Sequence, residues 1–186
     1  MKRFFDFSLA LFLIILFSIP ILFIFCLIKL TSNAPAIYWS KRIGKNNKVF
    51  NMPKFRSMNI ETPELPSDLL VNPKSFITPL GSFLRKTSLD ELPQLWCILI
   101  GNMSFVGPRP VLSNQNDLIN LRTKYGIHNL LPGLTGWAQI NGRDNVNTNE
   151  KVMLDLYYLN RRTFFFDLII IIKTIFKVIF SENISH

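Results

Sequence analysis

The sequence is organised around the stretch Arg85-Lys86-Thr87-Ser88-Leu89-Asp90-Glu91-Leu92-Pro93-Gln94-Leu95-Trp96. Ser88 and Glu91 have the Ser-x-x-Glu spacing of a capping box, which predicts that a helix begins here. Apolar residues then recur at helical spacing and stop at Gly101-Asn102. Pro93 suits the first residue of a helix better than its fifth, so a second version of the prediction starts the helix at Pro93. Both versions place Asp90 and Glu91 at the positive end of a helix.

The neighbouring carboxylates Asp90 and Glu91 predict two separate chemical roles. Adjacent helical residues point in different directions, so the two groups do not form a proton-sharing pair. One carboxylate can attack an electrophile, as Asp does when it forms an aspartyl-phosphate, while the other orients a metal ion or moves a proton. The structural alternative is that Glu91 closes the helix cap and Asp90 interacts with the helix dipole. This stretch alone leaves both interpretations open.

Composition points to a membrane and to an anionic partner. The chain has 186 residues, of which 48% are hydrophobic and 17 are Phe, enough for one domain with a core. Its formal charge of +9 suits lipid headgroups, nucleotide phosphates or nucleic acid, but no nucleic-acid-binding module is recognisable. Cys26 and Cys97 lie in apolar segments and do not indicate a disulfide. Two histidines in the whole chain argue against a zinc site.

An uncharged run of 22 residues extends from Phe7 to Ile28. A straight helix of this length measures about 33 Å, long enough to span a bilayer. The run exceeds the roughly 7–15 apolar residues of a signal peptide, although Ala34-Pro35-Ala36 faintly resembles a cleavage site. A single-pass anchor fits the length, and basic residues after the run would retain the following chain in the cytoplasm: Lys41, Arg42, Lys45 and Lys48.

A re-entrant helix, which enters the membrane and returns to the same side, is the third interpretation of this run. Basic residues flank both ends (Lys2, Arg3 and Lys29). In the middle, Pro20 removes a backbone hydrogen bond, and the Ser18 hydroxyl can satisfy a carbonyl that this break leaves unpaired. Spanning helices also tolerate proline, so physical chemistry alone leaves the spanning and re-entrant interpretations open.

The remaining segments alternate between short strands and helices. Residues 36–39 and 48–50 are predicted strands around a turn at 44–47, and residues 54–58 alternate basic with apolar side chains, typical of a strand face or of a phosphate contact. Residues 59–75 are predicted to form a polar surface loop. Predicted helices cover 77–86, which carries Arg85, and 114–125, 150–160 and 164–180. The last one is apolar with Lys173 and Lys177 on one face, which favours a position at a membrane interface over a buried core helix.

Two loops carry candidate ligand contacts. Arg109 lies between Pro108 and Pro110, which restrict its backbone and present its guanidinium from a stiff segment, as a bidentate phosphate contact requires. The alternative is a solvated arginine in a connecting loop. Residues 131–143 contain three glycines and are predicted to form a short strand that ends at an Asn141-Gly142 turn. Such glycines let backbone amides approach a ligand closely, and Arg143 adds charge.

Taken together, these motifs resemble the bacterial sugar transferase family, the monotopic phosphoglycosyl transferases. Members of that family transfer a sugar-1-phosphate from a UDP-sugar to undecaprenyl phosphate. The resemblance covers about residues 1 to 180 and is carried, in family order, by segments 54–58, 85–94, 101–110 and 132–143 and by Asp155 and Tyr158. Larger members of the family carry further spanning helices and another domain before this core, and this chain is expected to have the catalytic unit alone.

The resemblance implies a mainly helical α+β fold with a re-entrant membrane helix at residues 1–32. Residues 33–186 would form a compact cytoplasmic catalytic domain with short β-hairpins and interfacial amphipathic helices. The break in the membrane helix would involve Ser18 and Pro20, although Ile19 separates two residues that are commonly adjacent in the family. The enzyme would then lie on the cytoplasmic face of the bacterial inner membrane, in contact with lipids.

The resemblance also implies residue roles. Asp90 would be the nucleophile that forms a phosphosugar ester, and Glu91 would lie beside it at a Mg²⁺ site, which agrees with the oxygen ligands that this hard cation prefers. Candidates for contacts with the UDP-sugar are Arg56, Arg85, Arg109, Gln139 and Arg143, with Asp155 supporting the metal or the cations. Downstream glycosyltransferases are further expected partners. A different class, a non-catalytic membrane-anchored scaffold that binds nucleotide-sugars or glycan-assembly enzymes, fits the same basic surface.

Overall fold

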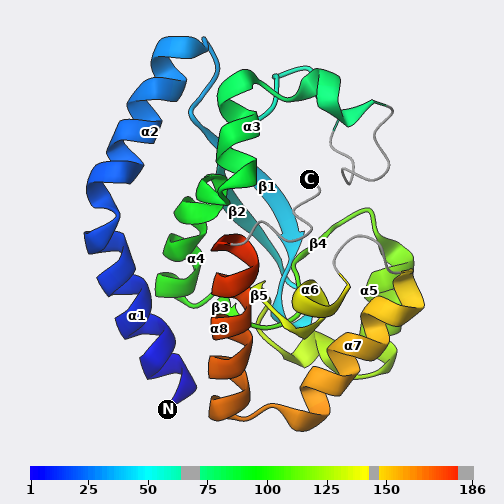
Figure 1. Ribbon diagram of the computed structural model, residues 1–186. Helices are drawn as coiled ribbons and strands as arrows, with labels where there is room; N and C mark the ends of the chain where they lie inside the picture. Colours follow the sequence, from blue (N-terminus) through cyan, green and yellow to red (C-terminus); the bar gives the residue numbers. More distant parts are fainter. Residues whose placement is uncertain (64–71, 143–146, 180–186) are drawn as a thin grey trace.

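The computed structural model describes residues 1–63, 72–142 and 147–179 of the chain (Figure 1). Its architecture is mainly helical with two small sheets, as predicted. Two long helices, α1 (Lys2–Leu16) and α2 (Ser18–Thr31), run along one flank, and α8 (Phe164–Ile179) lies beside the small sheet of β3 (Ser104–Val106) and β5 (Gly133–Thr135). Helices α5 (Asn116–Lys124) and α7 (Thr148–Arg161) pack together on the opposite side.

The two N-terminal helices meet at a 60° bend. Phe17 lies between them, so the break falls one residue before Ser18. Pro20, the third residue of α2, has no amide hydrogen to donate to the preceding turn, and the Ser18 hydroxyl donates to the Ile15 carbonyl at 2.8 Å. Among the described residues, no single helix is long and apolar enough to cross a membrane, whereas this bent pair passes by length and composition.

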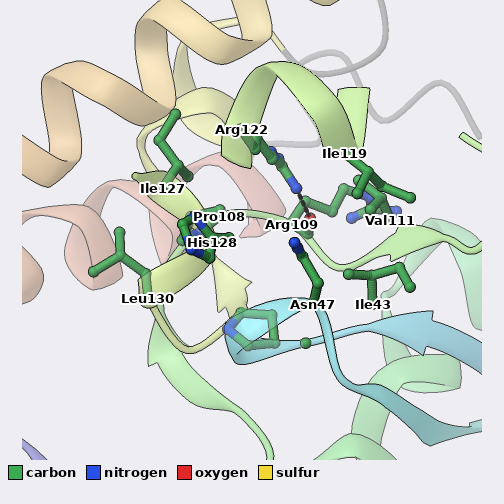
Figure 2. Close-up of a pocket in the computed structure, with 12 residues that line it drawn as sticks. Ile43, Asn47, Pro108, Arg109, Val111, Ile119, Arg122, Ile127, His128 and Leu130 are labelled. Atoms are coloured by element: carbon green, nitrogen blue, oxygen red, sulfur yellow. Dashed lines mark hydrogen bonds between the residues drawn. The ribbon is translucent and has the colours of Figure 1, made fainter. Parts of the chain in front are cut away.

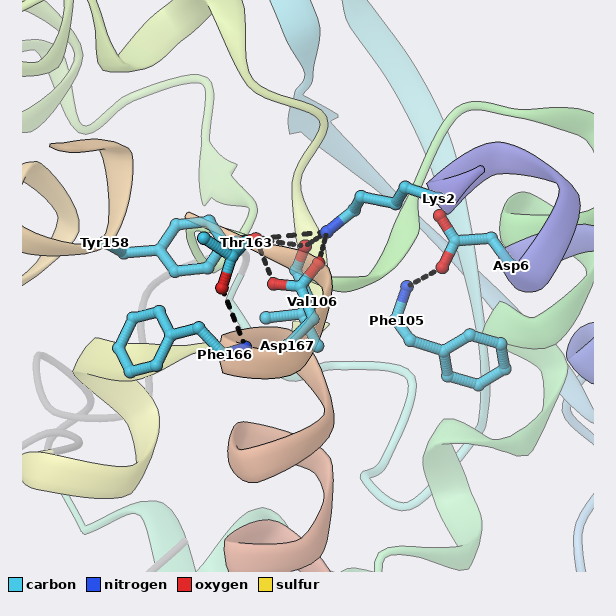
Figure 3. Close-up of polar contacts among 8 residues, drawn as sticks. All are labelled: Lys2, Asp6, Phe105, Val106, Tyr158, Thr163, Phe166 and Asp167. Carbon is cyan, nitrogen blue, oxygen red and sulfur yellow. Dashed lines mark hydrogen bonds and ion pairs between the residues drawn. The ribbon is translucent and has the colours of Figure 1, made fainter. Parts of the chain in front are cut away.

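The start of α1 is bonded to the rest of the chain by polar contacts (Figure 3). The Lys2 ammonium donates to the Val106 carbonyl at 2.9 Å, to the Tyr158 hydroxyl at 3.0 Å and to the Asp167 carboxylate at 2.6 Å. The buried Asp6 carboxylate accepts the Phe105 amide at 3.2 Å. These residues belong to β3 and to α7 and α8, so the first turns of α1 are part of the domain that carries the C-terminal helices.

The first sheet is an antiparallel hairpin extended by a short third strand. Strands β1 (Ile37–Ile43) and β2 (Val49–Phe55) pair from Ile37↔Phe55 to Ile43↔Val49 around the turn η1 (Lys45–Asn47). Strand β4 (Val111–Leu112) pairs antiparallel with the other edge of β1. The predicted hairpin is confirmed, and its strands are longer than the residues 36–39 and 48–50 that were expected.

The second sheet is a parallel pair, β3 (Ser104–Val106) and β5 (Gly133–Thr135), and not a further hairpin. A side chain at Gly133 or Gly136 would collide with the backbone of Gly107. These glycines therefore admit another segment of backbone, and that they also admit a ligand stays a prediction. The predicted strand ending at Asn141-Gly142 is wrong: Trp137–Asn141 forms the helix α6, which packs Ile140 into the core.

The predicted capping box at Ser88 and Glu91 is wrong as well. The helix α3 (Pro79–Lys86) ends in a tight turn in which Ser88 has a left-handed backbone (φ 56°) and makes no side-chain capping bond. The 3₁₀ helix η4 (Leu89–Gln94) follows with Pro93 inside it, and α4 (Leu95–Ile100) begins only at Leu95. Gly101 ends α4 with φ 91°, as the sequence predicted. The short helices η3 (Pro73–Phe76) and η5 (Ile127–Asn129) complete the fold.

The hydrophobic core includes the N-terminal helices. Ala10 of α1 is fully buried against α4, in one cluster with Ile98, Met103 and Ile170. Ile24 and Ile28 of α2 pack with Phe55 and Leu84 in a second cluster. A third cluster joins α5 to α7. The last helix, α8, buries Ile170 and leaves an apolar face exposed, which consists of Phe165, Ile169, Ile172, Ile175 and Phe176.

Candidate active site

The 3₁₀ helix η4 gives its two carboxylates different surroundings. With three residues per turn, adjacent side chains of a 3₁₀ helix point about 120° apart. Asp90 is 7% exposed, and its Oδ1 is buried without a hydrogen-bond donor among the described residues. Glu91 points toward β2, where its carboxylate forms a 2.6 Å ion pair with Lys54. The ion pair explains why Glu91 does not close a helix cap.

Burial dominates the electrostatics of Asp90. Loss of hydration raises the pKa of Asp90 from the ordinary 3.8 to about 6, because the charged form is disfavoured away from water. Lys54 opposes this rise in pKa most strongly, and Arg85 and Arg109 oppose it further, while the neighbouring Glu91 adds to it. Asp90 is therefore a poorly hydrated carboxylate that nearby cations keep largely ionised at neutral pH, the state that a nucleophile requires.

Asp90 and Glu91 line a cavity of about 1040 Å³. One part of its wall is strongly basic and includes Arg42, Lys54, Arg56, Arg85, Arg109, Arg122 and Lys151. Another part is apolar and comes from the helices α1 and α8 and the residue that follows α1: Leu9, Leu13, Phe17, Ile171, Ile175 and Val178. A cavity with both linings can hold a ligand with phosphate groups and a ligand with a hydrocarbon chain next to the same carboxylate.

The cavity brings together most of the residues that the sequence singled out. Arg85 and Arg109 line it, as does Gln139, whose amide donates to the Leu134 carbonyl at 3.4 Å. Arg56 lines it too and donates to the Pro35 carbonyl at 2.8 Å. Arg143 lies outside the described residues. Asp155 is buried beside the cavity and does not line it.

A model of the bacterial sugar transferase family matches residues 1–181 of this sequence. The chain belongs to the bacterial sugar transferase family. It is 39% identical to the uncharacterized sugar transferase EpsL of Bacillus subtilis (strain 168), over 100% of this chain and 91% of that protein. It is 37% identical to the undecaprenyl-phosphate galactose phosphotransferase of Salmonella typhimurium, over 94% of this chain and 40% of that protein.

A third relative is the UDP-glucose:undecaprenyl-phosphate glucose-1-phosphate transferase of Escherichia coli (strain K12). It is 39% identical over 95% of this chain and 40% of its own length. The sugar transferase described here thus spans less than half the length of two of these relatives and nearly all of EpsL. The family resemblance inferred from segments 54–58 to 132–143 is confirmed.

One residue that lines the sugar transferase cavity, Arg122, was not predicted from the sequence. Its guanidinium donates to Asp155 Oδ2 through two nitrogens, at 3.0 and 2.6 Å. A third nitrogen donates to the Arg109 carbonyl at 2.8 Å (Figure 2). The only local signal was a basic residue on a predicted polar helix, because the pairing with Asp155 spans 33 residues. Asp155 therefore acts on the cavity through Arg122, which holds the Pro108-Arg109-Pro110 segment.

Proposed function

We propose that this sugar transferase moves a sugar-1-phosphate from a UDP-sugar to undecaprenyl phosphate through a covalent intermediate on Asp90. The observation that carries the proposal is a buried carboxylate with an unpaired oxygen in a cavity that is basic on one side and apolar on the other. The names of the Salmonella and Escherichia relatives support the general reaction. The two linings match the two substrates, one with a diphosphate and one with an isoprenoid chain.

The chemistry divides into two displacements at one phosphorus atom. In the first, a carboxylate oxygen of Asp90 attacks the phosphorus that carries the sugar, the bond to the bridging oxygen breaks, and UMP leaves with that oxygen. In the second, a phosphate oxygen of undecaprenyl phosphate attacks the same phosphorus and the bond to Asp90 breaks. The carboxylate is regenerated, and the lipid diphosphate-sugar is the product.

The basic wall serves the first displacement. Negative charge develops on the bridging oxygen as UMP leaves, and fixed cations in a poorly hydrated site stabilise such charge most effectively. Arg85, Arg109 and Lys54 all act electrostatically on Asp90, so they lie where that charge develops. Lys54 has a second role, since its ion pair holds the Glu91 carboxylate in place.

Asp90 and Glu91 are also the residues that would hold Mg²⁺. The unpaired Oδ1 of Asp90 and the carboxylate of Glu91 are hard oxygen ligands, and Mg²⁺ is usually bound by one or two carboxylates together with substrate phosphates. In the described ranges no cluster of three or more His, Cys, Asp and Glu side chains forms a larger protein cage. The bound ion would neutralise charge on the diphosphate.

The proposal includes a membrane position at the cytoplasmic face of the bacterial inner membrane. The bent pair α1–α2 would enter the bilayer and return to the same side, with α8 at the interface. This is supported by contacts at both ends of the pair: Lys2 and Asp6 bond to the domain at one end, and Ile28 packs against Phe55 and Leu84 at the other. It is also supported by the exposed apolar side chains of α1, α2 and α8.

The test is release of UMP from a panel of UDP-sugars incubated with the purified protein, undecaprenyl phosphate and Mg²⁺. We expect one or a few UDP-sugars to yield UMP, and mass spectrometry without acceptor to detect a sugar-phosphate adduct on Asp90. Asp90→Asn should form no adduct. The alternative, a non-catalytic scaffold, would bind nucleotide-sugars without UMP release from any member of the panel.

A further inference from the structure

The basic part of the cavity extends well beyond Asp90 along strand β1. Tyr38 of β1 pairs with Lys54 of β2, and the Lys54 ammonium contacts the Glu91 carboxylate. Tyr38 therefore shows which part of β1 lies nearest to Glu91. Alternate residues of a strand share a face, and Ser40 and Arg42 line the cavity on the same face as Tyr38. Arg42 lies four residues from Tyr38, about 13 Å along the strand. The cavity therefore contains a polar arm that reaches far past the reacting carboxylate.

The far end of this polar arm is built from β1, β4 and the segment that follows β4. The Arg42 guanidinium donates to the Ser40 hydroxyl at 3.0 Å and to the Pro110 carbonyl at 3.3 Å, which fixes its position. The Gln115 side-chain oxygen accepts the Leu112 amide at 3.0 Å. This hydrogen bond fixes the orientation of the Gln115 side chain, and its NH₂ group remains a potential donor. Gln115 also lines the cavity.

Lys151 of α7 is a further basic residue of the cavity wall. It is four residues before Asp155 on α7, so both occupy one face of that helix, and Lys151 lines the cavity. Arg122, whose guanidinium also donates to the Arg109 carbonyl, is neutralised by its ion pair with Asp155. Within the described ranges, no carboxylate forms an ion pair with Lys151. Lys151 thus adds a positive charge to the wall.

We propose that the polar arm binds the nucleotide half of the donor, which leaves as UMP. Lys151 contacts its phosphate or ribose oxygens, and the Gln115 NH₂ donates to a carbonyl of the base. This deepens the proposed function and rests on it. The cavity must hold two chemically different ligands. UMP, the leaving group, is anionic and water-soluble, whereas the acceptor carries a hydrocarbon chain. The side chains that α1 and α8 give to the cavity wall are mainly apolar, with Lys177 of α8 as the charged exception, so the leaving nucleotide belongs in the arm lined by Arg42, Gln115 and Lys151.

The test is equilibrium binding of UMP to the purified full chain, together with steady-state kinetics for both substrates. We expect Lys151→Ala to weaken UMP binding and to raise the KM for the UDP-sugar roughly tenfold, the effect of one charge-assisted hydrogen bond. The KM for undecaprenyl phosphate should be unchanged. Lys41→Ala is the matched control, because Lys41 is exposed on the opposite face of β1 and its removal changes the net charge equally.

A second variant tests the base contact and does not depend on how well Lys151→Ala folds. Gln115→Glu keeps an acceptor for the Leu112 amide and removes the NH₂ donor. We expect it to weaken UMP more than ribose 5-phosphate, which lacks the base. Unchanged UMP affinity in both variants, or an effect on the lipid acceptor alone, would overturn the subsite. If wild type binds UMP yet releases none from any UDP-sugar, the proposed function fails and the subsite is still measurable.

Discussion

The ammonium of Lys2 lies 2.6 Å from Oδ2 of Asp167, so the second residue of the chain is bonded to the first turn of α8. The Tyr158 hydroxyl donates to the other oxygen of Asp167 at 2.6 Å, which leaves this buried carboxylate with partners on both sides. The first turn of α1 is thereby joined to α8, the last helix that the structure describes. This relationship restricts where the start of α1 can lie, because it must remain with the domain.

Removing the Lys2 charge should destabilise the fold. Lys2→Met leaves Asp167 buried with one partner fewer, and we expect the free energy of unfolding to fall by about 1–3 kcal/mol. Thermal unfolding in detergent measures the change. Lys29→Met is the control, since Lys29 is exposed at the end of α2 and loses the same charge. Equal melting temperatures for the two variants would contradict a structural role for the Lys2–Asp167 pair.

The helix break should determine membrane topology. Pro20→Leu restores the missing backbone donor and should straighten the segment toward a spanning helix, moving the N-terminus across the membrane. The measurement is labelling of Ser8→Cys by a membrane-impermeant thiol reagent in intact cells, after replacement of Cys26 and Cys97. We expect no labelling of the protein that retains Pro20 and labelling of the Pro20→Leu variant. Labelling of the protein that retains Pro20 would show that the segment spans.

Asp90→Asn should abolish turnover without loss of stability. The folded pKa of about 6 exceeds the unfolded value of 3.8, so protonation of Asp90 favours the folded state and that contribution is lost as the pH rises through 6. At neutral pH the buried charge is therefore unfavourable, and its removal should stabilise the protein by up to about 3 kcal/mol. The advantage should shrink below pH 6. A less stable Asp90→Asn protein at pH 7.5 would contradict this account of the carboxylate.

The kcat/KM for the UDP-sugar should fall on the acid side, because only ionised Asp90 is nucleophilic and burial raises the pKa of this carboxyl. Lys54 lowers this pKa, so Lys54→Met should move the acid limb to higher pH. The measurement is kcat/KM for the UDP-sugar between pH 5 and pH 8 in wild type, Lys54→Met and the exposed control Lys41→Met. If the acid side of the pH profile lies at the same pH in Lys54→Met as in wild type, the profile does not report the ionisation of Asp90.

Arg109 should tolerate no conservative replacement. Arg109→Lys keeps the charge and loses the planar guanidinium that can bind two phosphate oxygens, so we expect kcat/KM to fall at least tenfold, about 1.4 kcal/mol. Asp155→Asn should lower activity less directly, by weakening the hold of Arg122 on the Arg109 carbonyl. Asp117→Asn, on the exposed side of α5, is its control. Full activity in Arg109→Lys would show that Arg109 makes no bidentate phosphate contact and is a solvated residue of a connecting loop.

Patterns within a few residues determined much of this protein. The hairpin followed from two short β-prone segments around a turn, the end of α4 from Gly101, and the break near Pro20 from the missing amide hydrogen. The family resemblance followed from the order of several short motifs, and Asp90 and Glu91 stood out because two carboxylates lie beside cations. Each of these signals is encoded by neighbours in sequence, which is why sequence reasoning could read them.

Only the tertiary structure decided how the carboxylates are used. Glu91 had a good local partner in the Ser88 backbone, but Lys54, 37 residues away, forms an ion pair with it and η4 replaces the expected helix start. Asp155 acts through Arg122, and Gly133 of β5 and Gly136 after it meet the backbone of Gly107. Such contacts depend on which segments pack together. Packing also buries Asp90 and raises its pKa, a property that no spacing of residues along the chain encodes.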